Sequence, residues 1–229
     1  PIYKTLKGVW PGEIFLLSEQ TGDMAITPTR VGGDWWDGGV HMEMKLHTWQ
    51  ARNGQISTAW NNCTSGITTC NQIFATIEDS EMDEDLKERT LAEIRGIRAF
   101  WYYILIDYFG NAPLVADYES TELPGLSSRQ VLYDFVIDEL NEIKDVLRDD
   151  VTSESYGKFT QGVAYTLLAK MYLNAEVWTG TPNWQGVIDA CDKVMSLDYI
   201  IEPNWKTNFE VNNQVSNEII LPIAFGKAD

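Results

Sequence analysis

The sequence is short of basic residues and has no long apolar run. Lys and Arg total 17 against 34 Asp and Glu, which gives a formal net charge of -17. A field of this sign repels nucleic-acid phosphates and anionic lipid headgroups, so no nucleic-acid partner is expected. Neutral ligands and cations remain compatible with it. No apolar stretch of the sequence approaches the roughly 20 residues that a membrane-spanning helix needs.

The first residues lack the marks of a secretory leader. They contain no start methionine, no basic region and no apolar stretch. We therefore expect the chain to be a mature product or a fragment.

Cysteine is scarce, with only Cys63, Cys70 and Cys191. An odd number argues against a disulfide framework. Cys63 and Cys70 fall on one predicted helix, where seven residues separate them by roughly 10 Å, too far for a disulfide bond. All three lie on apolar stripes, so we expect buried free thiols.

Histidine is equally scarce, and the sequence predicts no metal or cofactor. His41, Glu43 and His47 could ligate a metal, but nothing enforces the geometry, and structural histidines are the favoured interpretation. No spacing typical of a calcium loop is present. One predicted helix carries an acidic row that is interpreted as a solvated face: Asp138, Glu142, Asp145 and Asp149.

No catalytic residue is predicted. The sequence has no GxSxG, no P-loop, and no GxGxxG that opens a helix. Asp34 and Asp37 could form the carboxylate pair that a glycosidase requires. Gly-flanked carboxylates are nevertheless common on loops without catalysis, so we expect a protein that is not an enzyme.

Apolar residues recur at helical spacing in five stretches, and one short strand is expected at Asn217–Ile223. The five predicted helices are one capped by Ser57 or Thr58, Asp83 to Phe109, one from a Ser127–Gln130 capping box to Leu147, Thr160 to Trp178, and Asn183 to Ser196.

The last two helices are joined by a short connection, which predicts antiparallel neighbours and a tetratricopeptide-like hairpin. Trp184, Val187, Cys191 and Val194 are expected to face inward. The predicted fold is mostly α, a scaffold of such helix pairs with long irregular loops and little strand.

Residues 18–56 have almost no helical period, and a loop of this length in a helical domain is usually functional or disordered. Its tryptophans argue against disorder. Glycine pairs flank Trp35 and Trp36, which stand between Asp34 and Asp37. In an extended stretch adjacent side chains point to opposite sides, so one indole can be buried while the other presents its face.

A flat indole suits the apolar face of a sugar ring, and Asp34, Asp37 and Arg30 can bond the hydroxyls at its edge. The sequence therefore predicts a glycan-binding loop made by Trp35, Trp36, Asp34, Asp37 and Arg30. The alternative is that both rings pin the loop to the helices.

From about Ala25 to Ile223 the sequence resembles the SusD/RagB family of surface glycan-binding lipoproteins of the Bacteroidetes. The most specific part is Arg95 to Val115, which is similar to the family's long helix and its aromatic-Gly-x-x-Pro turn. Further stretches resemble the helices and closing strand that follow: Ser128 to Leu147, Tyr156 to Thr160, Ala164 to Leu173, Trp184 to Tyr199 and Asn217 to Pro222.

The resemblance implies a SusD-like scaffold of tetratricopeptide-like helix pairs, with residues 1–229 as a single domain truncated at both ends. It implies a lipid anchor on the outer face of the outer membrane, and an anchor cysteine that is not in this chain. It also implies delivery of oligosaccharide to a SusC-like TonB-dependent outer-membrane transporter. The ligand would be a neutral or complex polysaccharide or oligosaccharide. Two alternatives remain: a helical-repeat adaptor that binds only protein, and a carbohydrate-active enzyme.

Overall fold

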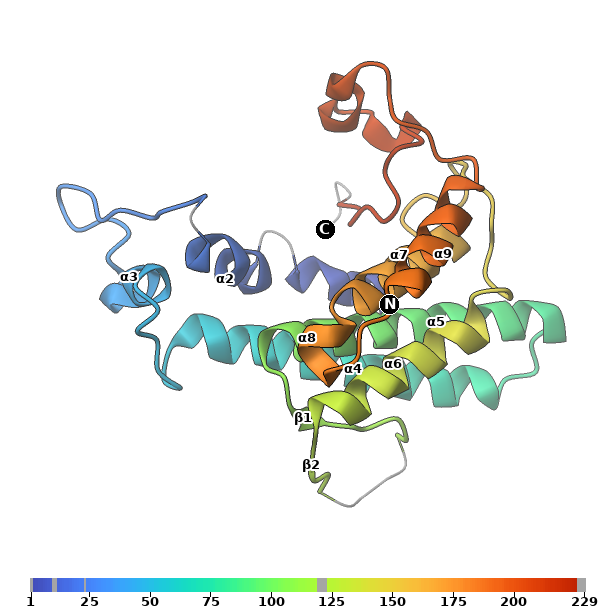
Figure 1. Ribbon diagram of the computed structural model, residues 1–229, viewed down its shortest axis with the longest axis horizontal. Helices are drawn as coiled ribbons and strands as arrows, with labels where there is room; N and C mark the ends of the chain where they lie inside the picture. Colours follow the sequence, from blue (N-terminus) through green and yellow to red (C-terminus); the bar gives the residue numbers. More distant parts are fainter. Residues whose placement is uncertain (1, 10–11, 23, 119–122, 226–229) are drawn as a thin grey trace. The chain divides into compact units, whose positions relative to one another are not determined.

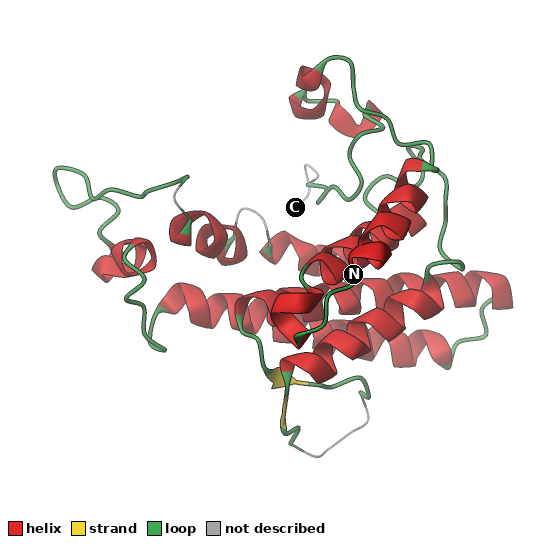
Figure 2. Ribbon diagram, viewed as in Figure 1, coloured by secondary structure: helices red, strands yellow, loops and turns green. Residues whose placement is uncertain are grey.

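The computed structural model describes residues 2–9, 12–22, 24–118 and 123–225. The chain forms two compact units, one of residues 3–66 and one that begins at Ile67 and also includes Ile2. In these residues helix predominates, and strand is confined to one two-stranded sheet (Figure 2). The prediction of a mostly α fold with irregular loops and little strand is confirmed.

The elements follow in the order that Figure 1 shows. The first are short: α1 (Ile2–Thr5), the 3-10 turn η1 (Leu6–Gly8), α2 (Glu13–Thr21), η2 (Asp37–Gly39) and α3 (Val40–Lys45). The scaffold helices are α4 (Gly54–Glu78), α5 (Glu84–Tyr108), α6 (Arg129–Ile143), α7 (Gln161–Leu173), α8 (Ala175–Thr179) and α9 (Trp184–Met195). Strands β1 (Ala112–Pro113) and β2 (Leu126–Ser127) pair antiparallel, and the 3-10 turns η3 (Trp205–Phe209) and η4 (Asn213–Val215) come last.

Helix α5 is the centre of the second unit, and both of its ends match the prediction. The Asp83 carboxylate accepts a hydrogen bond from the backbone N–H of Leu86 at 3.2 Å. Beyond the other end, Gly110 takes a left-handed φ of 78°. Side chains on most faces of the helix are buried: Ile94, Ile97, Trp101, Tyr102, Ile104 and Leu105.

Two helix pairs make the scaffold, α5 with α6 and α7 with α9 (Figure 1). Gly96 lets the Phe159 ring lie against the α5 backbone, because a Cβ at this position would come within 2.3 Å of that ring. Gly162 makes the same allowance for Tyr199 at the start of α7, where a Cβ would lie 2.4 Å from the ring. The predicted pairing of the last two long helical segments is confirmed.

Two helix starts differ from the prediction by local hydrogen bonding. Helix α4 begins at Gly54, before the predicted caps, because Asn53 Oδ1 accepts the backbone N–H of Gln55 at 3.0 Å. The cap of α6 is Ser128, whose hydroxyl accepts from the N–H of Val131. Ser127 is held in β2 opposite Ala112, so the predicted capping box does not form.

The predicted helix from Thr160 to Trp178 is interrupted at Asn174. The backbone N–H and the side-chain amide of Asn174 both donate to the carbonyl of Lys170, at 3.3 Å and 2.9 Å. Asparagine competes in this way with regular helical bonding, so α7 ends at Leu173 and α8 starts afresh.

Helix α9 has the predicted length but a different inner face. Trp184 is 51% exposed and Cys191 is exposed, so the expectation that both face inward is wrong. Ala190 is the buried residue of α9. The stripe with Trp184, Ile188 and Met195 is left open on the surface of the described residues.

The expected strand at Asn217–Ile223 is absent from the described residues. A single backbone hydrogen bond joins Ile200 N–H to the Asn217 carbonyl at 3.2 Å. Beyond it, side chains take the place of a ladder: Glu218 accepts the N–H of Glu202 at 2.9 Å, and Glu202 accepts the N–H of Asn217 at 3.1 Å. Carboxylates therefore satisfy the amides that a second strand would have bonded.

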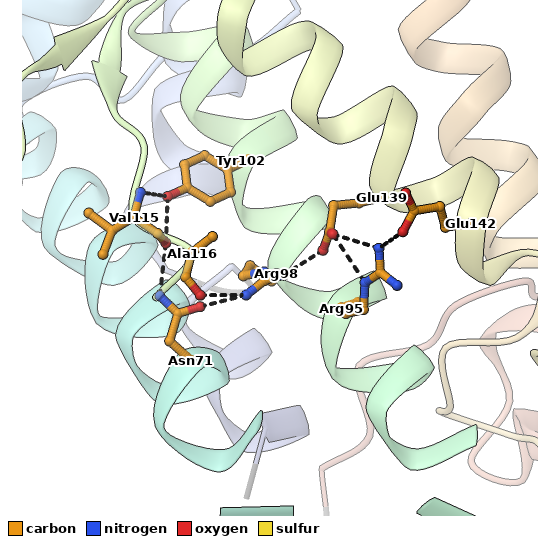
Figure 3. Close-up of polar contacts among 8 residues, drawn as sticks. All are labelled: Asn71, Arg95, Arg98, Tyr102, Val115, Ala116, Glu139 and Glu142. Atoms are coloured by element: carbon orange, nitrogen blue, oxygen red, sulfur yellow. Dashed lines mark hydrogen bonds and ion pairs between the residues drawn. The ribbon is translucent and has the colours of Figure 1, made fainter. Parts of the chain in front are cut away.

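A buried ion pair between Arg98 on α5 and Glu139 on α6 is the main polar contact of the second unit (Figure 3). Arg98 is 5% exposed and Glu139 is 8% exposed, and Arg98 Nη2 lies 2.6 Å from Glu139 Oε2. Arg98 Nη1 also donates to Asn71 Oδ1 on α4 at 2.9 Å and to the carbonyl of Ala116 at 3.1 Å.

Arg95 completes the network at its exposed side. It donates to Glu139 Oε1 through Nε at 3.0 Å and Nη2 at 2.7 Å, and it pairs with Glu142. Burial alone would lower the pKa of Arg95, but the hydrogen bonds to these two carboxylates outweigh it and raise the pKa. The network thus joins α5 and α6 by charge as well as by apolar packing.

Replacing Glu139 by Gln should lower the free energy of unfolding by about 3–5 kcal/mol, because the buried Arg98 charge loses its partner. Glu142→Gln is the matched control, since it removes a carboxylate on the same helix whose side chain is 66% exposed. It should cost no more than about 1 kcal/mol. Urea unfolding followed by circular dichroism measures both, and equal losses would contradict the assignment.

Cysteine labelling tests the burial of the thiols. Burial raises the pKa of Cys63 and of Cys70 to about 12, whereas Cys191 is exposed. A disulfide reagent should therefore modify Cys191 in the native protein, and the other two only after denaturation. Mass spectrometry of labelled peptides identifies the sites. Rapid native labelling of Cys63 or Cys70 would be incompatible with this core.

Candidate functional site

The predicted glycan-binding residues lie together in the first unit, on the loop that leads into α3. Trp35 is 50% exposed and Trp36 is 52% exposed. The expectation that one indole is buried while the other is presented is therefore wrong. Its premise was an extended backbone, but Trp35 has a left-handed φ of 64°, so the two side chains do not alternate across a strand.

Each indole contacts a neighbouring residue of the same unit and keeps part of its surface exposed to solvent. The guanidinium carbon of Arg30 lies 6.0 Å from the centre of the Trp35 ring. The ring of His41 meets Trp35 edge to face, with centroids 6.2 Å apart and an interplanar angle of 61°. The Trp36 ring lies against Gly39, where a Cβ would be 3.5 Å from its Cη2 atom.

The backbone of this loop is left-handed at most positions from 32 to 39. Glycine adopts such angles freely, whereas Trp35 and Asp37 do so at an energetic cost of about 1–3 kcal/mol each. The positive φ angles are 107° at Gly32, 95° at Gly33, 64° at Trp35, 42° at Asp37, 70° at Gly38 and 89° at Gly39.

Backbone hydrogen bonds close the loop on itself. Arg30 donates its N–H to the Asp34 carbonyl at 2.9 Å, and Gly33 donates back to the Arg30 carbonyl at 3.0 Å. Gly39 donates to the Trp36 carbonyl at 2.6 Å, which starts the turn into α3. These bonds bring Arg30 and Asp34 to the two sides of one turn.

His41 connects the loop to two other elements. Its Nε2 lies 3.1 Å from Asp37 Oδ2, and its Nδ1 lies 2.6 Å from Gln20 Nε2 on α2 and 3.3 Å from Gln55 Nε2 on α4. His41, Gln20 and Gln55 are all buried, while the Asp37 side chain is 61% exposed. A buried polar group thus reaches the surface of the loop through Asp37.

Sequence reasoning did not identify this role of His41. The available signal was its position four residues after Asp37, a spacing at which side chains meet across a helical turn. The weaker metal hypothesis placed it with Glu43 and His47, but these bond elsewhere. Glu43 accepts from Asn53 Nδ2 at 3.0 Å, and His47 Nε2 lies 2.8 Å from the Thr21 carbonyl. No group of three or more potential ligands that could hold a metal ion occurs in the described residues.

The arrangement suits a ligand that has a flat apolar face and a hydroxyl-rich edge. Two half-exposed indoles supply surface for the face. Asp34, Asp37 and Arg30 lie on the same loop and supply acceptors and donors for the edge.

Within the described ranges, no helix is both long and apolar enough to cross a membrane.

Residues 17–173 match the model of a SusD-like family that is described as starch-binding and associated with the outer membrane. The starch-binding protein SusD of Bacteroides thetaiotaomicron is 32% identical over 161 residues, which cover 69% of this chain and 28% of that protein.

Solved structures show the same fold. A laminarin-binding SusD-like protein has 21% identity and a TM-score of 0.82, over 96% of this chain and 48% of its own. A surface glycan-binding protein A from Bacteroides thetaiotaomicron, in complex with laminarihexaose, has 19% identity and a TM-score of 0.79, over 97% of this chain and 47% of its own. The chain therefore spans about half the length of these structures.

Replacing Gly33 by Ala should destabilise the loop by roughly 1 kcal/mol, because its φ of 95° disfavours any side chain. No atom lies near enough to clash with the added methyl group, so the loss of stability reports the backbone strain alone. Gly125→Ala is the control, since that site also has open space and does not have a positive φ. Denaturant unfolding followed by tryptophan fluorescence compares them, and an equal effect would argue against a left-handed loop.

Proposed function

Because the chain belongs to the SusD-like family, we propose that it binds a neutral or complex polysaccharide or oligosaccharide through the Trp35–Trp36 loop, without catalysis. The observation that supports this most directly is the pair of half-exposed indoles on one loop, with the Arg30 guanidinium beside Trp35 and with Asp34 and Asp37 adjacent in sequence. Proteins of the same fold include one described as laminarin-binding and one in complex with laminarihexaose.

The five loop residues have distinct roles in this proposal. Trp35 and Trp36 stack on sugar rings, since stacking uses the open half of each indole. Asp37 and Asp34 accept hydrogen bonds from hydroxyls, and Arg30 donates to them. The formal net charge of -17 disfavours anionic polymers, so a neutral glycan is the expected ligand.

We further propose the cellular setting that the family match supports. Residues 1–229 form part of one SusD-like domain of a protein held by a lipid anchor at the outer face of the outer membrane. It passes oligosaccharide to a SusC-like TonB-dependent transporter. The family description, starch-binding and associated with the outer membrane, supports the location, whereas transporter and anchor are inferences from membership.

Trp35→Ala and Trp36→Ala should each weaken binding at least about tenfold, roughly 1.4 kcal/mol, because each removes a central stacking surface. Affinity electrophoresis in gels with laminarin or starch measures retention. Trp184→Ala is the matched control, because that indole is 51% exposed and lies on α9, away from the loop in sequence.

Two outcomes of the gel experiment are distinct, and two further assays test the alternative functions. Loss of retention in both loop variants, with the control unchanged, supports the proposal. Normal retention in both, with an intact fold, overturns the stacking role. Release of reducing ends from either polysaccharide by the purified protein would contradict the absence of catalysis, and co-purification with a transporter without glycan affinity would favour an adaptor.

A further inference from the structure

His41 is buried beneath the proposed glycan-binding loop, and each of its ring nitrogens lies within hydrogen-bond distance of a side chain. Only 8% of the residue is exposed. One nitrogen meets the Asp37 carboxylate at 3.1 Å, and the other meets the amide nitrogen of Gln20 at 2.6 Å. A ring with a partner on each side is fixed in orientation as well as in place.

The chemistry of these partners determines which nitrogen carries the proton. With the side-chain amide nitrogens of Gln20 and Gln55 facing the ring, the hydrogen-bond pattern assigns Nδ1 as the acceptor, without a hydrogen of its own. The proton then lies on Nε2, which donates to Asp37 Oδ2. The chain of contacts runs from buried amides through the imidazole to a surface carboxylate.

We propose that His41 is the positioning residue of the glycan-binding loop: its Nε2–H tautomer orients the Asp37 carboxylate, while its ring edge supports Trp35. The inference rests on the proposed function for its consequence in binding. One oxygen of Asp37 is taken by the imidazole, and the side chain remains 61% exposed, so its other oxygen is left for a ligand hydroxyl. Trp35, with its ring centroid 6.2 Å from that of His41, is held by the same residue.

The loop has a specific need for such a support. Asp37 has a left-handed φ of 42° and Trp35 one of 64°, angles that these residues rarely adopt without outside constraint. His41 contacts both of them, and it is tied to α2 and α4 through Gln20 and Gln55. The amide oxygens of both glutamines are buried without a hydrogen-bond partner in the described part of the chain. Turning either amide would place an oxygen toward Nδ1 in place of an N–H, so the tautomer of His41 reports the orientation of these amides directly.

Nuclear magnetic resonance of the nitrogen-15-labelled protein tests the tautomer without any ligand. The chain has two histidines, so a long-range proton–nitrogen correlation shows two rings, and His47→Asn assigns them. Asn is chosen because His47 has a φ of 55°, which Asn tolerates. The expected result is a protonated Nε2 and an unprotonated Nδ1 for His41. An Nδ1–H tautomer or a doubly protonated ring at neutral pH would overturn the proposal.

Binding of laminarihexaose and of soluble starch, by isothermal titration calorimetry, tests the consequence. His41→Phe keeps an aromatic edge toward Trp35 but removes the hydrogen bonds to Asp37, Gln20 and Gln55, and it should weaken binding about tenfold. His41→Gln offers an amide N–H to Asp37 and should recover part of the loss. His47→Asn should bind as the unmodified protein does. Equal binding by His41→Phe would overturn the positioning role.

A double-mutant cycle separates action through Asp37 from a general effect on folding. Asp37→Asn removes the charge at an exposed side chain and suits the left-handed backbone. If His41 acts through Asp37, the two losses in affinity combine to less than their sum. Additive losses would overturn the link. If His41→Phe does not fold, Asp37→Asn still decides, because it must shift the Nε2 resonance of His41.

Failure of the proposed function has a different signature. If the unmodified protein binds neither glycan, the glycan-binding proposal fails for these probes. Two measurements then test the positioning role alone. One is the tautomer of His41. The other is the change in Trp35 fluorescence caused by His41→Phe, with Trp35→Phe as the reference that identifies the Trp35 signal. If the unmodified protein binds and only the His41 predictions fail, the glycan-binding proposal stands and the positioning role does not.

Discussion

The second unit depends on one constraint, the burial of a charge on its central helix. Arg98 lies on α5 where most neighbouring side chains are apolar, and the phenyl rings of Phe74 and Phe135 each stand 5.6 Å from its guanidinium carbon. A buried guanidinium costs several kcal/mol in lost hydration unless it is paired. Glu139 supplies the pair from α6, and Asn71 supplies a further acceptor from α4.

The same constraint extends to the chain that follows α5. Asn71 donates to the Val115 carbonyl at 2.8 Å, and Tyr102 exchanges hydrogen bonds with the backbone of Val115. Burial raises the pKa of Tyr102, so its hydroxyl keeps the proton that it donates. The segment that follows β1 is thus held to α4 and α5 at Val115 and Ala116 (Figure 3).

How far the sequence predicts this fold varies with the range of the interactions involved. Helix α5 is predicted at both ends because Asp83 and Gly110 act within a few residues. The inner face of α9 is not, because periodicity finds an apolar stripe but not which of two overlapping stripes meets α7. The composition of the Asn217–Ile223 segment predicts a strand. In the structure the carboxylates of Glu218 and Glu202 accept the backbone N–H groups of Glu202 and Asn217, and no local sequence pattern predicts these contacts.

In the candidate site, too, features set by neighbouring residues are predicted from the sequence and those set by distant residues are not. Glycine pairs and adjacent tryptophans single out the loop, and Arg30 is close to Trp35 because turn residues are close in sequence. The left-handed angles of Trp35 and Asp37 run against the preferences of these residues, so they are apparent only in the folded structure. The bonds of His41 to Gln20 and Gln55 join residues 21 and 14 positions apart from three different elements, and no spacing rule predicts them.

The closed backbone of the 30–39 turn has a thermodynamic consequence. Four glycines give this segment a large conformational freedom in the unfolded chain, and folding removes that freedom before any ligand arrives. A surface that is ordered in advance loses little further entropy on association, so more of the contact energy remains as affinity. Under the proposed function, exchange of one sugar ring for the next along a polymer then requires no reordering of the protein, and a long chain advances across the two indoles by successive small steps.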